Sequence, residues 1–315
     1  MTIKSFFKLV ELPTKVASVF PFAVGTLYAI YRYNQFNLLN FLIMLVAMLC
    51  LDMATTALNN YMDYKLALKT HGFNYEQHNA IVKDKIKEST VKFTIGFLMS
   101  ITVILGLVLV YLTDVFILLL GMVSFFFAVI YTWGPVPISR TPLGEIVSGT
   151  VMGGIIPLIS LYIHIYDRGL IELGVNNSVV SLSLNFVEIL AILVLTIPLI
   201  MGIAGIMLAN NTCDMEDDSE NRRFTLPLLI GKDKALHLFV GLYIVAYGAI
   251  LVGVLLRWLP YTCLLVLATA PVIKKHTDIF KKEQTKKNTF IVSVKNFIIL
   301  SAAYVLSLVF GILLA

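Results

Sequence analysis

Long, continuously apolar runs follow one another along the chain, separated by shorter polar stretches. Most runs hold about 18 to 24 residues, enough to cross a hydrocarbon core of about 30 Å as a helix. A membrane β-barrel would instead alternate apolar and polar residues in segments of about 10. The pattern therefore predicts an all-α, polytopic membrane protein. We expect nine transmembrane helices, at about 16–33, 38–58, 91–113, 115–132, 146–166, 186–209, 236–258, 259–273 and 296–314.

The basic residues divide unevenly between the two sides that nine spans create. All of the 24 lysines and arginines except Arg32, Arg168 and Arg257 fall in or beside the N-terminus and the loops after even-numbered spans. Lysine and arginine favour the cytoplasmic side, so we expect an integral protein of the cell membrane with its N-terminus inside and its C-terminus outside. This distribution explains the net charge of +5 without a nucleic-acid partner; the lipid bilayer is the expected partner instead.

The composition supports this class. Hydrophobic residues make up 58% of the chain and charged residues 14%, against roughly 45–50% and about 25% in soluble domains. Two loops on the predicted cytoplasmic side, at about 60–90 and 210–235, are long and rich in both charge signs, so we expect function there. They follow the second and sixth spans, the spacing expected of a bundle with two related four-helix halves plus one helix. We interpret 1–315 as a single transmembrane domain.

The sixth span runs directly into the sequence NNTCDMEDDSENRRFTLPLLIG, at 210–231. On a continuing helix Asp214 and Asp218 share one face, with Asp217 beside them and Asn210 one turn earlier. Carboxylates so close repel unless a cation lies between them. Mg²⁺ suits such a site, because it takes a few carboxylates and completes its coordination with phosphate oxygens.

A weaker copy of this arrangement ends the second span, in LDMATTALNNYMDYK. Asn59 and Asp63 are again four residues apart, and Asn60 lies three before Asp63. Asp52 lies further back in the same span, about 16 Å deeper than Asp63 along a helix. A carboxylate inside a membrane is costly, so we expect Asp52 to face a polar cavity or a partner.

Basic residues lie on the same predicted side as both acidic clusters. One acidic cluster alone is most often a solvated surface. Two clusters at matching helix ends, together with nearby cations, instead describe a site for a polyanion and its metal. The cations in question are Lys83, Lys85, Lys87, Arg140, Arg222 and Arg223.

The segment YTWGPVPISRTPLGEIVSG opens at Tyr131 and gathers prolines and glycines around Arg140 and Glu145. Its composition alone indicates a rigid turn between helices. Three stretches nevertheless resemble the UbiA superfamily of intramembrane aromatic prenyltransferases: KVASVFPFAVGTLYA, GPVPISRTPLGEIVSG and NNTCDMEDDSENRRFTLPLLIG. The resemblance covers nearly the whole chain and is strongest to the branch that prenylates 1,4-dihydroxy-2-naphthoate in menaquinone synthesis.

By the resemblance, Mg²⁺ and the diphosphate would be bound by Asn59, Asp63, Asp214 and Asp218, the three aspartates being catalytic and Asp217 supporting. From their charge and position on the same predicted side, we expect further contacts to the diphosphate from Lys83, Arg140, Arg222 and Arg223. Other supporting residues would be Asn60, Asn210, Tyr131 and Asp52, and Mg²⁺ is the expected cofactor.

The sequence also departs from the family pattern. The first motif commonly reads Asn-Asp-x-x-Asp with a further Asp or Gly four residues on, but here Asn60 replaces the middle acid and Ala67 the last position. One carboxylate must then do more of the metal binding. In the second motif Arg222 stands where the naphthoate branch often has glycine before a basic residue, here Arg223. Either the grip on the diphosphate or the substrate would differ.

The expected activity is Mg²⁺-dependent transfer of a polyprenyl group from an allylic diphosphate to 1,4-dihydroxy-2-naphthoate, with loss of the ring carboxylate, to give a demethylmenaquinone precursor. The same chemistry on 4-hydroxybenzoate or on haem is an alternative. An ion-coupled transporter is an alternative of another class, since polar residues in spans also mark ion pathways. A transporter predicts acids near the midplane of several spans, whereas only Asp52 and Glu188 lie inside them, which disfavours this class.

Overall fold

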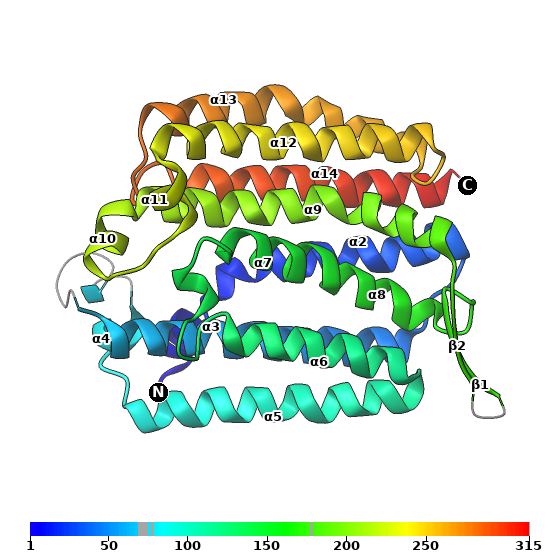
Figure 1. Ribbon diagram of the computed structural model, residues 1–315, viewed down its shortest axis with the longest axis horizontal. Coiled ribbons are helices and arrows are strands. Elements are labelled where there is room, and N and C mark those ends of the chain that lie inside the picture. Colours follow the sequence, from blue (N-terminus) through cyan, green and yellow to red (C-terminus); the bar gives the residue numbers. More distant parts are fainter. Residues whose placement is uncertain (69–74, 77–78, 177–178, 315) are drawn as a thin grey trace.

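A bundle of long helices lying side by side forms the body of the molecule (Figure 1). The computed structural model describes residues 1–68, 75–76, 79–176 and 179–314. The long uninterrupted helices are α2 (Val16–Tyr33), α3 (Leu38–Leu66), α5 (Glu88–Leu112), α6 (Val115–Ile130), α9 (Phe186–Cys213), α12 (Lys232–Leu255) and α14 (Ile291–Leu313).

Two further rods in the bundle are composite. One joins α7 (Gly144–Thr150), a π-helical turn η4 (Val151–Ile155) and α8 (Ile156–Ile165). The other joins a 3₁₀ segment, η5 (Tyr261–Thr269), to α13 (Ala270–Lys282). The short helices are α1 (Ile3–Leu9), η1 (Leu12–Lys15), α4 (Ala80–Lys83), η3 (Ile138–Arg140), α10 (Met215–Glu220) and α11 (Leu226–Ile230).

The all-helical membrane class predicted from the sequence is confirmed. Among the described residues, six helices are long and apolar enough to cross a membrane: Leu38–Leu66, Glu88–Leu112, Gly144–Ile165, Phe186–Cys213, Lys232–Leu255 and Ile291–Leu313. Large apolar side chains such as Phe93, Leu107 and Phe126 are exposed on α5 and α6. Such a surface suits lipid rather than water, so the chain is an integral membrane protein.

Polar residues at the turns set the helix ends. Asn34 ends α2 in the left-handed region, at φ 52°, and the Asn37 side chain then caps α3 by accepting from the Asn40 N–H. Asp114 caps α6 in the same way, accepting from the backbone N–H groups of Phe116 and Ile117. Each cap satisfies amides that the helix leaves unpaired, which fixes where one rod stops and the next begins.

Two glycines allow neighbouring helices to approach closely. A Cβ on Gly25 of α2 would lie 2.2 Å from the Pro157 carbonyl oxygen of α8. A Cβ on Gly153 of η4 would lie 2.5 Å from the Ile200 nitrogen of α9. Small residues at such crossings let backbones pack against each other, which is how helices associate within a membrane. These contacts hold α7 and α8 between α2 and α9.

Two features differ from the sequence prediction. The helices α3 and α9 continue past the predicted spans, so Asn60 and Asp63 lie on a helix rather than in a loop beginning at residue 60. Part of that predicted loop, 69–74 and 77–78, lies outside the described residues. An antiparallel hairpin, β1 (Ile171–Asn176) and β2 (Val179–Leu184), joins α8 to α9 with Ile171 opposite Leu184. It lies at the end of the bundle opposite α10 (Figure 1).

Candidate active site

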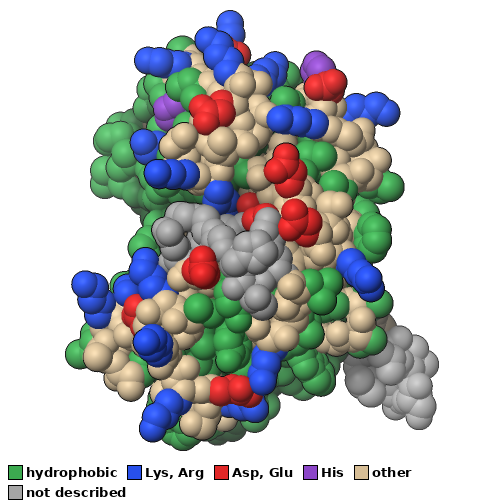
Figure 2. Space-filling view, turned by 90° about the vertical axis from the view of Figure 1, so that its left-hand side faces the viewer, with side chains coloured by type: hydrophobic (Ala, Val, Ile, Leu, Met, Phe, Trp, Pro, Cys, Tyr) green, Lys and Arg blue, Asp and Glu red, His purple; other side chains and the backbone are tan. Residues whose placement is uncertain are grey.

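Charged side chains gather at the end of the bundle where α3 and α9 finish, and Figure 2 shows acidic groups near its centre with basic groups around them. Asp63 comes from α3, Asp214 from the junction of α9 and α10, and Asp218 from α10. The helix breaks at Asp214, yet the Asp218 N–H still donates to the Asp214 carbonyl oxygen at 2.7 Å. The one-turn spacing predicted from the sequence therefore survives the break.

Arg223 links the two acidic motifs. Its Nη1 lies 3.7 Å from Asp63 Oδ1 and its Nε lies 3.3 Å from Asp218 Oδ1. Its Nη2 donates to the Ser139 carbonyl oxygen at 3.3 Å. Burial alone would lower the pKa of the guanidinium, but Asp63, Asp218 and Asp214 together raise it. Arg223 thus brings α3, α10 and the segment around η3 together as a fixed cation.

Asp218 is the most deeply placed of the three carboxylates, with 4% of its surface exposed. Thr225 Oγ1 donates to its Oδ2 at 3.2 Å. Burial raises the pKa of the Asp218 carboxyl to about 6, with Asp214 adding to the rise and Arg223 opposing it. The negative charge of Asp218 is costly to hold in this buried position, so a bound cation would stabilise it. This suits Asp218 to be a metal ligand.

Lys286 completes the cluster, and no motif in the sequence singled it out. It lies between α13 and α14, and its Nζ is 2.5 Å from Asp214 Oδ2. The same ammonium donates to Asn210 Oδ1, which joins that predicted residue to the site. Its only sequence signal was membership of a basic cytoplasmic loop, a property that it shares with six other lysines of that loop.

Arg140 and Asn59 lie against the same cluster. Burial and the neighbouring Arg223 lower the pKa of Arg140, while Asp63 and Asp218 oppose this shift. The Arg140 carbonyl oxygen accepts from the Phe224 N–H at 2.9 Å, which ties η3 to the turn that carries Arg223. Asn59 Nδ2 donates to Asp63 Oδ2 at 3.4 Å. Both residues therefore lie beside the acidic cluster.

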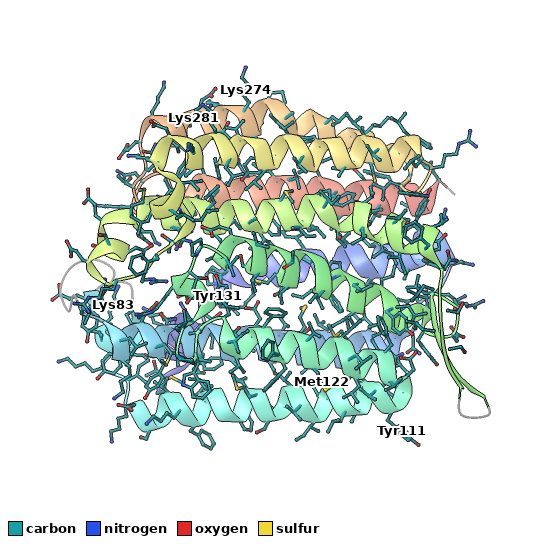
Figure 3. All side chains as sticks on the ribbon, viewed as in Figure 1. Lys83, Tyr111, Met122, Tyr131, Lys274 and Lys281 are labelled. Atoms are coloured by element: carbon teal, nitrogen blue, oxygen red, sulfur yellow. The ribbon has the colours of Figure 1, made fainter. Side chains whose placement is uncertain are left out.

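The other predicted residues have different surroundings. The Asn60 amide donates to the Leu9 carbonyl oxygen at 3.0 Å and to Glu11 Oε1 at 3.1 Å, so it holds the N-terminal segment. Asp217 lies half-buried on α10. Figure 3 shows Lys83 at the same end of the bundle, beyond Tyr131. Four of the cations that the sequence singled out have exposed side chains: Lys83, Lys85, Lys87 and Arg222.

The backbone explains the unusual Arg222. Its φ of 53° lies in the left-handed region, which costs a non-glycine residue about 1 to 2 kcal/mol. Replacing Arg222 with glycine is expected to raise the free energy of unfolding by about 1 kcal/mol and leave activity unchanged. Thermal unfolding in detergent, together with a turnover assay, checks this. A less stable or inactive Arg222→Gly protein would show that the exposed side chain has a role of its own.

The intramembrane Asp52 has a partner, as the sequence predicted. Lys15 Nζ lies 2.6 Å from Asp52 Oδ1, and Ser18 Oγ donates to Asp52 Oδ2 at 2.6 Å. Glu188, the other acid inside a predicted span, forms an ion pair with Arg32 at 2.7 Å. Both carboxylates therefore pair neighbouring helices. Such pairing offsets the cost of placing a charge in the membrane.

An apolar cavity of about 650 Å³ lies among α3, α5, α6 and the rod formed by α7 and α8. Figure 3 places two of its lining residues, with Tyr131 nearer the charged cluster and Met122 further along the bundle. Its wall is made mainly of aliphatic and aromatic side chains, with Asp52 and Ser148 among the few polar ones. The cluster of Asp63, Asp214, Asp218, Arg223 and Lys286, called the charged cradle below, thus lies next to an apolar cavity.

The carboxylates do not make a complete set of metal ligands by themselves. Among the described residues, no three His, Cys, Asp or Glu side chains are grouped as a complete ligand set. Mg²⁺ is usually held by one or two carboxylates plus substrate phosphates and waters. Asp63 and Asp214, already facing the cations Arg223 and Lys286, supply such a partial set. The residues present fit a Mg²⁺ ion that a diphosphate helps to bind.

A helical membrane protein with a charged cradle beside an apolar cavity is suited to a molecule with an anionic head and a long apolar tail. The arrangement defines a class of membrane proteins with a site for such amphiphiles. The chain belongs to the UbiA prenyltransferase family, whose model matches residues 18–313. It is therefore a prenyltransferase, and the alternative of an ion-coupled transporter is set aside.

Individual relatives agree with this family. The chain is 32% identical over 250 residues to the 1,4-dihydroxy-2-naphthoate octaprenyltransferase of Bacillus subtilis (strain 168), covering 78% of this chain and 73% of that one. A UbiA homologue from Aeropyrum pernix K1 has the same fold, with a TM-score of 0.68 at 18% identity, covering 97% of this chain and 98% of that chain. A homologue from Archaeoglobus fulgidus, solved with GPP and Mg²⁺, gives 0.64 at 13% identity over 98% and 99% of the two chains.

Proposed function

We propose that this protein transfers a polyprenyl group from an allylic diphosphate to 1,4-dihydroxy-2-naphthoate in a Mg²⁺-dependent reaction. The observation that carries the proposal is the pairing of Asp63 and Asp218 with Arg223, and of Asp214 with Lys286, next to an apolar cavity. The choice of acceptor is supported by the Bacillus subtilis relative, whose name states this acceptor. A homologue bound to GPP and Mg²⁺ supports the diphosphate and the metal.

The residues of the cradle have complementary tasks in this proposal. Arg223, Lys286 and Arg140 bind the oxygens of the diphosphate through charge-assisted hydrogen bonds. Asp63, Asp214 and Asp218, with Asn59 beside them, hold Mg²⁺, which when bound neutralises charge on the leaving diphosphate. Lys83 and Arg222 stay outside this set because their side chains are exposed.

The cavity supports the second half of the reaction. An isoprenoid chain lying among α3, α5, α6 and α8 would place its allylic carbon at the cavity end near Tyr131, beside the cradle. Departure of the diphosphate takes the electrons of the C–O bond and leaves an allylic cation, which the electron-rich ring attacks. Loss of the ring carboxylate as CO₂ then restores aromaticity. The apolar wall keeps water away from the cation.

We further propose that all of 1–315 forms one domain with nine membrane crossings. To the six long apolar helices this adds α6, α2 and the rod η5–α13, which lie alongside them in Figure 1. The two motifs then end the second helix of each four-helix half, with α14 as the additional helix. The distribution of basic residues supports a cytoplasmic site and an internal N-terminus in the cell membrane.

Turnover by the purified protein tests the proposal. The protein in detergent is incubated with 1,4-dihydroxy-2-naphthoate and allylic diphosphates of increasing chain length, with Mg²⁺ or with EDTA. We expect a decarboxylated, prenylated product by mass, formed only with Mg²⁺, and a preferred chain length. Product from 4-hydroxybenzoate instead would keep the chemistry and overturn the acceptor. No prenylated ring from either acceptor would overturn the proposed function.

A further inference from the structure

Glu145 is a buried acid that has no role in the reaction proposed above. It lies in the first turn of α7 with 4% of its surface exposed. Asn211 Nδ2 of α9 donates to its Oε1 at 2.8 Å. Its Oε2 is buried and accepts no hydrogen bond from any part of the chain that the structure describes. A buried carboxylate oxygen without a donor is costly, so it calls for an explanation.

The hydroxyl of Tyr131 lies near this acid. It is a hydrogen-bond donor, whereas Glu145 Oε2 is an acceptor that lacks a donor among the described residues. The Tyr131 hydroxyl is buried, and among the described residues it makes no hydrogen bond of good geometry, although the Ser148 hydroxyl lies close enough to interact with it. It also lies near Gly144, the residue before Glu145. The nearby Ser148 hydroxyl donates to the Glu145 carbonyl oxygen at 3.2 Å. A phenol can donate and a carboxylate oxygen can accept. Together they suit a ligand hydroxyl, which does both.

This pair lies at the border between the cavity and the cradle. Ser148, one turn along α7 from Glu145, lines the cavity, as does Tyr131. On the other side, Asp218 lies close enough to Glu145, and Arg223 close enough to Tyr131, to act on them electrostatically. A substrate with its chain in the cavity and its diphosphate in the cradle must place its reacting carbon at this border.

We propose that Glu145 is a catalytic residue that takes the hydroxyl proton of the aromatic acceptor, with Tyr131 donating a hydrogen bond to the same oxygen. This inference rests on the proposed function. The proton moves to Glu145 Oε2, and the oxygen electron pair is released into the ring. The ring carbon forms a bond to the allylic carbon as the diphosphate leaves with the C–O electrons. Loss of CO₂ returns an electron pair to the ring, and Glu145 gives its proton back to the oxygen.

A purely structural acid would behave differently in a matched substitution. In Glu145→Gln the side-chain carbonyl can still accept from Asn211, so the link between α7 and α9 is kept. Only the ability to take a proton is lost. If Glu145 merely joins the two helices, this variant retains activity; if it takes the proton, the variant folds but turns over slowly.

The experiment compares wild type, Glu145→Gln and Glu145→Ala, with Glu216→Gln as a control that removes an exposed acid of α10. In Glu145→Gln we expect kcat to fall about a hundredfold or more, the lower end of general acid–base contributions. The KM for the allylic diphosphate and its Mg²⁺ dependence should stay within about twofold, because the cradle is intact. Added formate should restore part of the activity of Glu145→Ala by replacing the missing carboxylate.

The outcomes separate this inference from the proposed function. Absence of product from the wild type overturns the proposed function itself. An active wild type with near-normal Glu145→Gln overturns the role of Glu145 alone. Binding of a non-ionising thiolo-diphosphate analogue by Glu145→Gln checks its folding, and loss of that binding also overturns the role. Slow turnover by Glu145→Gln with normal analogue binding, and formate rescue of Glu145→Ala, support it.

Discussion

Asp218→Asn is expected to lower turnover about a hundredfold to a thousandfold, the range seen when one preorganised electrostatic contact to a transition state is removed. Asparagine has the same shape and can still accept from Thr225, so the turn after α10 should hold. It cannot supply a negative charge, and the affinity for Mg²⁺ should fall with the activity. Steady-state turnover measured across a Mg²⁺ titration, with thermal unfolding of each variant, checks this.

The same helix offers a control. Glu216→Gln also removes one negative charge from α10, but Glu216 is exposed. We expect its turnover and Mg²⁺ dependence to match the wild type. Asp214→Asn should behave like Asp218→Asn, because Asp214 faces Lys286 on the other side of the cradle. Near-normal activity in both aspartate variants would contradict the assignment of these carboxylates to the metal.

Hydropathy predicted the positions of the long helices well, but it predicted the residues at which they end less well. The first expected span, 16–33, coincides with α2, which ends at Asn34 in the left-handed region. The second was expected to stop at residue 58, whereas α3 continues to Leu66. Apolar character marks where a helix leaves lipid, and a polar helix continues beyond that point unnoticed. The first motif is consequently part of a rigid helix.

The sequence indicated the acids of the site and two of its cations, Arg140 and Arg223, but not Lys286. The four-residue spacing of Asp214 and Asp218 is local, so the sequence was sufficient for it. Lys286 reaches Asp214 only through the packing of the segment between α13 and α14, and no local pattern records that contact. Hairpin pairing between β1 and β2 was missed in a segment whose sequence suggested only a loop.

Arg222 and Arg223 are adjacent cations next to the second motif, and their charge and position predicted a contact to the diphosphate for both. The sequence distinguished them only in that Arg222 stands at a position where the naphthoate branch often has glycine. The left-handed turn at Arg222 leaves its own side chain exposed and turns Arg223 inward, between Asp63 and Asp218. The different exposure of the two side chains follows from the backbone turn at Arg222. It predicts that substitution by lysine lowers activity at Arg223 and has no effect at Arg222.

Arg223→Lys is accordingly expected to lower kcat/KM for the allylic diphosphate about a hundredfold, or about 2.7 kcal/mol, although the charge is kept. A lysine ammonium is a single point charge, whereas the guanidinium reaches Asp63, Asp218 and the Ser139 carbonyl oxygen with three different nitrogens. The lost contacts leave Asp218 buried with its positive partner displaced, so the variant should also unfold at a lower temperature.

Arg222→Lys is the matched control, since it makes the same change one residue earlier on an exposed side chain. We expect its kcat/KM and unfolding temperature to equal those of the wild type. The two variants are compared by initial rates over a range of allylic diphosphate concentrations at saturating Mg²⁺. Equal losses at both positions would mean that the diphosphate is held by a diffuse positive charge. A loss confined to Arg223→Lys would mean that it is held by one guanidinium fixed between the two acidic motifs.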